Sequence, residues 1–249
     1  MNRTLTISSI AVAIVAITAS AGYADSSKHL LASWSFDEGE DAVVLDASRN
    51  GHNGQMRAGK AGARPTRVNG MVGQAMRFRA AAGTDILVRK HARLNPTSGL
   101  TISAWIKHEG PIGSTAEILG KKGLARSIVD GYRLCVSRTG SLCLEIGDGT
   151  AVSRVQTTRG TIRPDTWYFV AATFAPGRGR LYINGRLIVD QEISANKIAP
   201  SNNNLVIGNF AGRRNAMPFN GLIDEVNLLD IAIGADEIFE LARPTRLQQ

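Results

Sequence analysis

One stretch near the C-terminus, residues 219–226, constrains the fold most, because it has the composition of a strand but carries two adjacent acids. It is apolar at both ends and continues into the apolar run 227–229, as strands do. Regular alternation breaks in the middle, where two apolar residues precede Asp224 and Glu225. A carboxylate carried toward a core is costly unless a cation or several donors meet it. We therefore expect a fixed partner elsewhere, and the loop 46–54 is the best candidate.

The loop 46–54 is rich in groups that turn the chain and present oxygen atoms. It contains Asp46, one Ser, two Asn and two Gly within nine residues. Glycines permit tight turns, and short polar side chains direct oxygens inward. This composition suits calcium, which takes several oxygen ligands, although no Glu closes an EF-hand loop. Two interpretations stay open at this point: a calcium loop and an Asx-type turn.

Several short strands separated by turns predict an all-β protein. Residues 100–107 alternate, 166–174 are nearly continuously apolar, and Asn184-Gly185 is a strong hairpin signal. The one convincing helix is short, from about 235 to 242. We expect one antiparallel β-sandwich of jelly-roll type over residues 30–242, with two sheets and a short C-terminal helix. Trp105 falls on the polar face of its strand, where it either stacks on a sugar or packs under a loop.

The N-terminus has the pattern of a secretory signal. A basic start, an apolar run from Leu5 to about Ala21 and small residues before position 25 predict a signal peptide over 1–24 and a mature domain over 25–249. No other segment is long and apolar enough to span a bilayer. We expect a secreted or periplasmic protein in an oxidising compartment.

The stretch 132–146 predicts a hairpin that specifies its own register. Placing the loop at 138–140, with Gly140 in the left-handed position, sets the pairs along both strands. The pairs are Val136 with Leu142, Leu134 with Leu144, Arg133 with Glu145, and Cys135 with Cys143. Since export implies oxidising conditions, we expect Cys135 and Cys143 to form a disulfide; the alternative is two free thiols.

Positive charge is concentrated in residues 57–93, which hold nine basic residues against one acid in 37 positions. The whole chain carries a formal charge of +8, and loss of Arg3 with the signal gives +7. Arg77 and Arg79 share a strand face and can grip carboxylate or sulfate groups. We expect an anionic partner there, an acidic polysaccharide or envelope surface; the alternative is a solvated basic face. Nucleic acid is disfavoured, because Phe78 is the sole aromatic and points inward.

Several stretches, in order, resemble the laminin-G-like jelly-roll family of concanavalin-A-like sandwiches. The matching stretches are 34–39 (Trp-Ser-Phe-Asp-Glu-Gly), 46–54, 100–106, 167–174, 181–185 and 219–226. The resemblance implies the jelly-roll fold and a structural calcium ion. Carried over, the side-chain oxygens of Asp46, Asn50 and Asp224 would bind it, helped by backbone carbonyls near His52. Arg49 stands where the family usually has Gly.

The sequence does not predict catalysis. The Glu-x-Asp-x-x-Glu run of laminarinase-type relatives is missing, and the two adjacent acids 224 and 225 should point to opposite faces of a strand. The histidines lack the neighbours that a polysaccharide lyase needs. We therefore expect a non-catalytic module that binds carbohydrate, with anionic polysaccharide as one possibility. An adhesion domain that binds another protein is the alternative, and a glycoside hydrolase or lyase is disfavoured.

Overall fold

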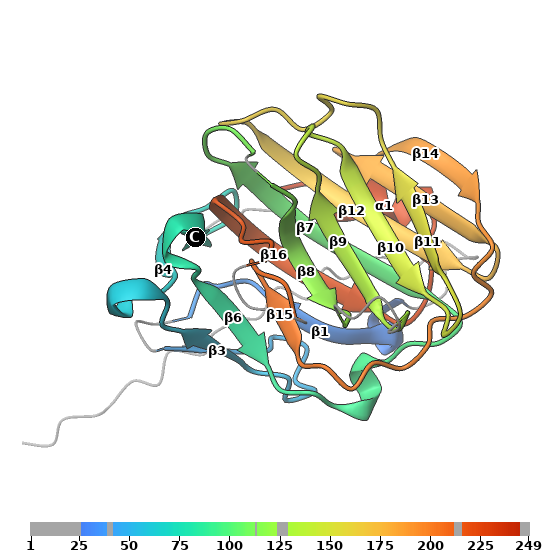
Figure 1. The fold of residues 1–249 in the computed structure, drawn as a ribbon, viewed down its shortest axis with the longest axis horizontal. Helices are drawn as coiled ribbons and strands as arrows, with labels where there is room; N and C mark the ends of the chain where they lie inside the picture. The colour runs from blue at the N-terminus through green and yellow to red at the C-terminus, as the bar shows by residue number, and fades with distance from the viewer. Residues whose placement is uncertain (1–25, 39–41, 113, 124–128, 212–215, 245–249) are drawn as a thin grey trace, which may run out of the picture.

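The computed structural model describes residues 26–38, 42–112, 114–123, 129–211 and 216–244. Within these ranges the chain forms two antiparallel sheets that pack face to face, with β8 to β11 in front of β7, β12 and β16 in Figure 1. The proposed signal peptide lies outside the described residues. In the described part, no helix has the length and apolarity needed to cross a membrane.

Each sheet contains eight strands of the described residues. Sheet A consists of β1 (Leu30–Trp34), β4 (Thr66–Asn69), β5 (Gln74–Phe78), β7 (Leu100–His108), β12 (Trp167–Ala175), β13 (Arg178–Ile183), β14 (Arg186–Glu192) and β16 (Gly221–Leu229). Sheet B consists of β2 (Val43–Val44), β3 (Gly54–Arg57), β6 (Asp85–Val88), β8 (Ala116–Lys121), β9 (Tyr132–Val136), β10 (Leu142–Gly147), β11 (Val152–Gln156) and β15 (Leu205–Ile207). The order in sheet A is β14-β13-β12-β7-β16-β5-β4, with β1 also on β16; in sheet B it is β11-β10-β9-β8-β15-β6-β3-β2. The predicted antiparallel sandwich is thus confirmed.

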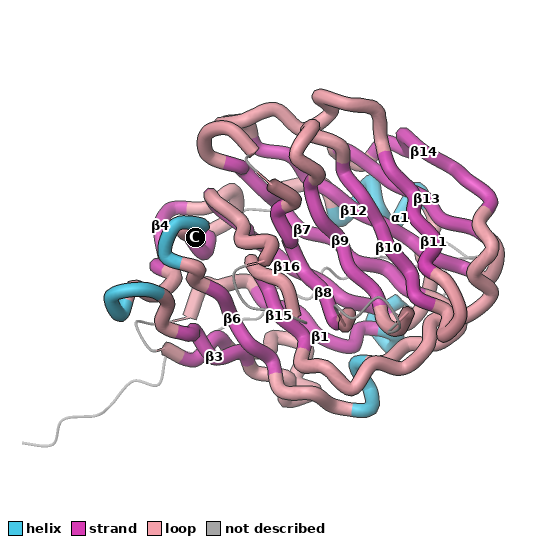
Figure 2. The backbone as a smooth tube through the Cα atoms, in the orientation of Figure 1, coloured by secondary structure: helices cyan, strands magenta, loops and turns pink. Residues whose placement is uncertain are grey.

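Helical structure is confined to short pieces, as Figure 2 shows in cyan. The 3₁₀ turns are η1 (Ser26–His29), η2 (Lys60–Gly62), η3 (Ala80–Ala82) and η4 (Ala92–Leu94), and the α-helix is α1 (Ala235–Leu241). α1 matches the predicted C-terminal helix. At its start, Glu237 accepts a hydrogen bond from the backbone N–H of Gly234 (3.2 Å), which satisfies one of the otherwise unpaired donors of the first turn.

The β9–β10 hairpin has the register that its sequence predicts. Cys143 lies opposite Cys135. The pairs Leu142–Val136 and Leu144–Leu134 both face the core. Gly140 adopts a φ of 74°, the left-handed conformation assigned to the turn. The Asn184-Gly185 turn is also confirmed, because both residues have positive φ, as a type I′ turn requires.

Trp105 does not face solvent. It is 6% exposed and packs edge-on against Phe169, with ring centroids 5.5 Å apart. Both belong to an apolar cluster on the outer side of sheet A, which Ile238 of α1 covers. The packing interpretation of Trp105 is therefore correct, and its ring is not available to stack on a sugar.

The closing strand β16 contains a β-bulge at its two acids. Its register against β7 shifts between Asp224 and Asn227, and Glu225 has a φ of 48°. Ile223 and Val226 both join the core between the sheets, although three positions apart they would face opposite sides of a regular strand. The extra residue therefore lets two consecutive acids avoid the core. The expectation that Asp224 and Glu225 follow regular alternation was wrong, because it assumed an unbroken strand.

Candidate functional site

Asp46 organises its own loop. Its Oδ1 accepts hydrogen bonds from the Ser33 N–H (3.0 Å), the Ser48 N–H (3.0 Å) and the Ser48 hydroxyl (2.6 Å), and its Oδ2 accepts one from the His52 N–H (2.9 Å). The Asp46 N–H in turn donates to Asn53 Oδ1 (2.8 Å). A carboxylate has about four acceptor positions, two on each oxygen; here three donors meet Oδ1 and one meets Oδ2. This geometry is that of an Asx-type turn that leaves one acceptor position open on Oδ2.

Asn50, the second residue expected at a calcium site, joins two parts of the chain. Its amide Nδ2 donates to the carbonyl oxygens of Leu30 (2.8 Å) and Leu31 (3.1 Å), and its Oδ1 accepts from Arg93 (3.4 Å). The preceding Arg49 adopts a φ of 66°, the left-handed conformation that explains why glycine suits this position in relatives. Asn50 therefore serves as a link rather than as a free oxygen ligand.

Asp224, the third expected ligand, lies beneath a different loop. Its side chain is fully buried, and Oδ2 accepts hydrogen bonds from the backbone N–H groups of Met71 (2.9 Å) and Val72 (3.0 Å). Oδ1 is buried and has no partner among the described residues. A Cβ on Gly70 would lie 2.5 Å from Oδ2, so glycine is needed for the loop to close over the carboxylate. Asp224 and Asp46 share no hydrogen-bond partner, and the prediction that they share one cation stays untested.

Three further acids surround Asp224. Burial raises the pKa of Asp224 to about 7 against the opposing backbone N–H groups, and burial together with Asp224, Asp37 and Glu38 raises the pKa of Glu225 to about 8. Both carboxylate oxygens of Glu38 are buried without a hydrogen bond in the described structure. Asp37 accepts from the Gln74 N–H (2.6 Å). None of these four acids forms an ion pair with a described residue.

The orphaned oxygens of Asp224 and Glu38 test the fit of a metal ion. Buried carboxylate oxygens without donors are costly, and a hard cation accepts several such ligands. The four acids are not gathered at coordination distance, since no set of three His, Cys, Asp or Glu side chains in the described ranges forms a ready metal site. The orphaned oxygens of this cluster would suit a cation, whereas the oxygens of Asp46 and Asn50 already accept hydrogen bonds. The prediction of calcium at Asp46, Asn50 and Asp224 stays untested.

The basic segment is partly tied into the fold. Arg57 forms a bidentate pair with Asp85 (2.7 Å for its Nη2), and Arg77 forms an ion pair with Glu109 (2.9 Å). Arg79 is exposed, and its side chain forms no hydrogen bond or ion pair with the described residues. Arg77 and Arg79 therefore do not act as an equivalent pair, and only Arg79 is unengaged.

A second charged cluster covers the outer face of sheet B. Glu145 is bound by both Arg133 (two bonds of 2.8 Å) and Arg154 (2.6 Å), and Lys122 lies 3.9 Å away. Burial would raise the pKa of Glu145, but the two guanidinium groups outweigh it and hold that pKa below its usual range. Glu117 is fully buried and lies 3.6 Å from Arg133; burial raises its pKa to about 8 against the attraction of that arginine. Arg133 is engaged by Glu145, so burial prevails at Glu117.

Cys135 and Cys143 lie on the same outer face as this charged cluster. Both are buried free thiols in this structure. The Ser137 N–H donates to the Ser141 carbonyl (2.8 Å), and because pairs alternate along an antiparallel ladder, the cysteine pair occupies a hydrogen-bonded position. Such pairs have Cα atoms about 5.5 Å apart, within the range that a disulfide spans. The disulfide stays a prediction that this geometry permits.

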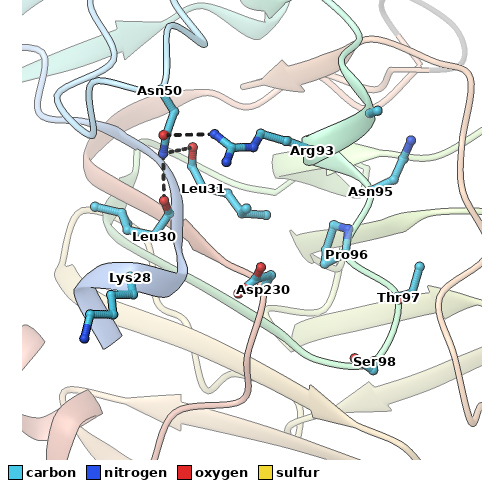
Figure 3. Close-up of a pocket in the computed structure, with 11 residues that line it drawn as sticks. Lys28, Leu30, Leu31, Asn50, Arg93, Asn95, Pro96, Thr97, Ser98 and Asp230 are labelled. Carbon is cyan, nitrogen blue, oxygen red and sulfur yellow. Dashed lines mark hydrogen bonds between the residues drawn. The ribbon is translucent and has the colours of Figure 1, made fainter. Parts of the chain in front are cut away.

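A surface pocket lies where β1, η1, η4 and the segment 95–98 meet. Its volume is about 330 Å³, in the lower range for small-molecule sites. Figure 3 shows Asn95, Pro96, Thr97 and Ser98 along one wall, facing Leu30, Leu31 and Asn50. Lys28, Ala92, Arg93 and Asp230 complete the lining. The pocket thus combines amide, hydroxyl, carboxylate and guanidinium groups with apolar surface.

Both walls of the pocket are fixed by hydrogen bonds. Asn95 accepts from the Ser201 N–H (3.1 Å), the Thr97 carbonyl accepts from the Ile198 N–H (2.8 Å), and Asp230 pairs with His29 (2.8 Å). Sequence patterns gave no indication of this pocket, since its residues come from four separated segments. For the acid cluster a signal did exist: the acidic turn 37–41 and the doubled acids of β16 were both visible, but nothing in the sequence joined them.

Comparisons with known proteins found one matching family model and several similar solved structures. The model of the concanavalin A-like lectin/glucanases superfamily matches residues 81–239, well over half of the chain. No curated protein sequence matches it.

Among solved structures, the binding domain of Paraclostridial Mosquitocidal Protein 1 is similar with a TM-score of 0.67 and 19% identity, covering 87% of this chain and 52% of that one. Domain 4 of AbnA, an extracellular GH43 arabinanase from Geobacillus stearothermophilus, was solved in complex with arabinotriose. It is similar with a TM-score of 0.65 and 19% identity, and the match covers 86% of this chain and 98% of that one. The botulinum neurotoxin serotype D ligand binding domain, in complex with N-acetylneuraminic acid, has a TM-score of 0.62 and 16% identity. The match covers 87% of this chain and 51% of that one.

This chain spans about half the length of the two toxin domains and nearly all of the arabinanase domain. At these identities the similarity establishes the fold. Together with the family match, it shows that the chain belongs to the concanavalin A-like lectin/glucanase superfamily.

Proposed function

We propose that this protein is a non-catalytic carbohydrate-binding module that acts outside the cytoplasm, either secreted or periplasmic. The pocket beside β1 is the observation that carries this proposal. It is preformed, with both walls held by hydrogen bonds, and it presents amide and hydroxyl groups beside Leu30, Leu31 and Pro96. A sugar has the same two properties, hydroxyl groups at its edge and apolar C–H groups on its faces, so it matches such a lining.

The solved relatives support the carbohydrate class. The arabinanase domain was solved with arabinotriose, and the serotype D toxin domain with N-acetylneuraminic acid. These ligands belong to those proteins, and they motivate the choice of probes for this one.

A catalytic role for the two buried glutamates on sheet B is less well supported. Their pKa values are moved apart, as in acid–base pairs. However, Glu117 is fully buried, and Glu145 is 6% exposed with two guanidinium groups on its oxygens. A carboxylate in that state is not free to attack a substrate or to activate water, so we assign this pair a structural role.

We also propose that the acid cluster of β16 binds a structural cation, with calcium as the first candidate. Asp224 and Glu38 would contribute their orphaned oxygens, with Glu225 and Asp37 beside them. A bound divalent ion would supply the positive charge that these four acids lack among the described residues. This assignment moves the site away from Asp46 and Asn50.

Binding of the purified protein to a panel of neutral and acidic polysaccharides tests the module. We expect retention of at least one polysaccharide without any release of reducing ends over prolonged incubation. Binding to no polysaccharide would overturn the proposal and favour the alternative of an adhesion domain for another protein. Release of sugar would show an enzyme.

A further inference from the structure

The pocket beside β1 contains a positive charge that its own lining does not neutralise. Arg93 is exposed, forms no ion pair with a described residue, and makes one long hydrogen bond of 3.4 Å to Asn50. A guanidinium group has five N–H donors in a planar fork, so most of them face the cavity or solvent. In Figure 3 Arg93 points across the top of the pocket toward Asn50.

The one acid of the lining has its own partner. Asp230 Oδ1 lies 2.8 Å from His29 Nδ1, and the side chains of Asp230 and His29 are 42% and 41% exposed. Asp230 is therefore directed to His29 rather than to Arg93. Its other oxygen can accept a hydroxyl group, which an acidic or a neutral sugar supplies equally.

The remaining polar groups suit the hydroxyls of a sugar ring. Thr97 and Ser98 are exposed, and their hydroxyls make no hydrogen bond within the described structure. Opposite them, Leu30 and Leu31 are partly buried and offer apolar surface. A ligand that fits all of these groups has one anionic substituent for Arg93, several hydroxyls, and an apolar ring face.

The Asp46 loop explains why Arg93 is held at this place. The four hydrogen bonds to Asp46 fix the loop, the loop fixes Asn50, and Asn50 is bound on one side to the carbonyls of β1 and on the other to Arg93. The local turn at η4 restrains the Arg93 backbone, since its N–H donates to His91 Nδ1 (3.2 Å). The guanidinium group itself is oriented by the hydrogen bond to Asn50, and such restraints reduce the entropy lost when it binds a carboxylate.

We propose that this pocket binds a carboxylate-bearing saccharide unit, with Arg93 on the carboxylate and Thr97, Ser98 and Asp230 on the hydroxyls. This inference rests on the proposed carbohydrate-binding function and names both its site and its ligand class. Arg93 belongs to the basic segment 57–93, so an anionic ligand is consistent with the charge of that segment. In this proposal the ligand carboxylate contacts Arg93, whereas Arg77 keeps its ion pair with Glu109.

The test compares three probes by calorimetry: an α-1,4-linked galacturonic acid trimer, the corresponding neutral galactose trimer, and inorganic sulfate. We expect the acidic trimer to bind at least tenfold more tightly than the neutral trimer, because charge-assisted hydrogen bonds are the stronger ones. Sulfate, which has charge but no ring, should bind far more weakly. Equal affinity for both trimers would overturn the acidic specificity, and sulfate binding as tight as the acidic trimer would overturn the saccharide.

Two matched variants locate the site. Arg93→Gln should lose tenfold or more in affinity for the acidic trimer, whereas Arg79→Gln removes the same charge from another exposed position and should change affinity by less than twofold. Amide shifts in a titration should fall on Asn50 and on residues 93–98 other than Pro96, which has no N–H. If Arg93→Gln binds like wild type, or if both variants lose equally, the pocket is wrong while the module survives. If wild type binds no saccharide of the wider panel, the proposed function itself fails.

Discussion

Two regions of this molecule bury carboxylates in different ways. On sheet B, Glu145 receives two guanidinium groups, and Arg133 also lies near Glu117. At β16, Asp224 and its neighbours have no ion pair among the described residues, and Asp224 Oδ1 and both Glu38 oxygens lack a donor. The first region compensates Glu145 within the chain, but it leaves both oxygens of the buried Glu117 without a hydrogen bond, so Glu117 takes up a proton. The second region has no cationic partner at all among the described residues, so added metal ions should affect it more strongly than the first.

Removing the central cation of the sheet B cluster should have the largest effect. Arg133→Met leaves Glu145 with fewer donors and Glu117 without its nearest cation, in a place where both are buried. Breaking one side of a buried ion pair costs about 3–5 kcal/mol. Urea unfolding measures it, and Arg138→Met at the exposed hairpin turn is the control, expected to leave the free energy of unfolding nearly unchanged. A loss below 1 kcal/mol would mean that the cluster does not hold the sheet.

Glu117 should make stability depend on pH. Its pKa is about 8 in the folded protein against 4.5 ordinarily, so between these values the folded state binds more protons. The contribution of this group is therefore complete below pH 4.5 and is lost as the pH rises through 8, a change on the order of 5 kcal/mol over the whole range. Glu117→Gln should flatten the curve between pH 5 and 8. The same slope in both proteins would assign it to another group.

The effect of calcium on the melting temperature should distinguish Asp46 from Asp224, the two acids that were expected to share one cation. At a concentration one hundred times its dissociation constant, a bound ion stabilises the folded state by about 2.7 kcal/mol. We expect wild type to melt at a higher temperature in calcium than in chelator, and Asp224→Asn to lose that difference. Asp46→Asn should melt lower in both conditions, because it weakens the loop, but should keep the calcium response. The reverse pattern would restore the site to the Asp46 loop.

The hairpin disulfide should have the smallest effect. Cys135 and Cys143 close a loop of nine residues, so the chain-entropy model gives at most roughly 2.6 kcal/mol, before any strain in the folded state is subtracted. Protein exported to an oxidising compartment should have a mass two hydrogens below the reduced form and should unfold at higher urea than the same sample after reduction. The Cys135→Ser variant should show no such change on reduction. Two free thiols in natively exported protein would contradict the pairing.

The parts of the fold that sequence could predict are those set by neighbouring residues. The hairpin register followed from matched pairs around Gly140, and the Asn184-Gly185 turn from its need for positive φ. The bulge at Glu225 was missed because regular alternation was assumed. Two acids between two core residues could have suggested it, since a regular strand cannot bury both Ile223 and Val226.

The candidate sites were harder to predict, because they depend on which segments meet. The resemblance implied a metal at Asp46, Asn50 and Asp224, a prediction that stays untested, and only tertiary structure shows that Asp46 accepts three backbone N–H groups and the Ser48 hydroxyl. Arg93 was one of nine basic residues with nothing to distinguish it. Its role depends on a hydrogen bond to a residue 43 positions away, and no local pattern encodes that separation.

The bulge in β16 makes the number of residues in this strand matter as much as their identity. A substitution at Glu225 changes one side chain, and Glu225→Gly would even remove the left-handed backbone strain of a non-glycine residue. Deletion of the same residue would remove the bulge and restore regular alternation, because Ile223 and Val226 would then lie two positions apart and Leu228 would still face the core. Across related sequences, this strand should therefore occur with the bulge or one residue shorter without it, whereas a deletion elsewhere in β16 would turn the following side chains to the other face.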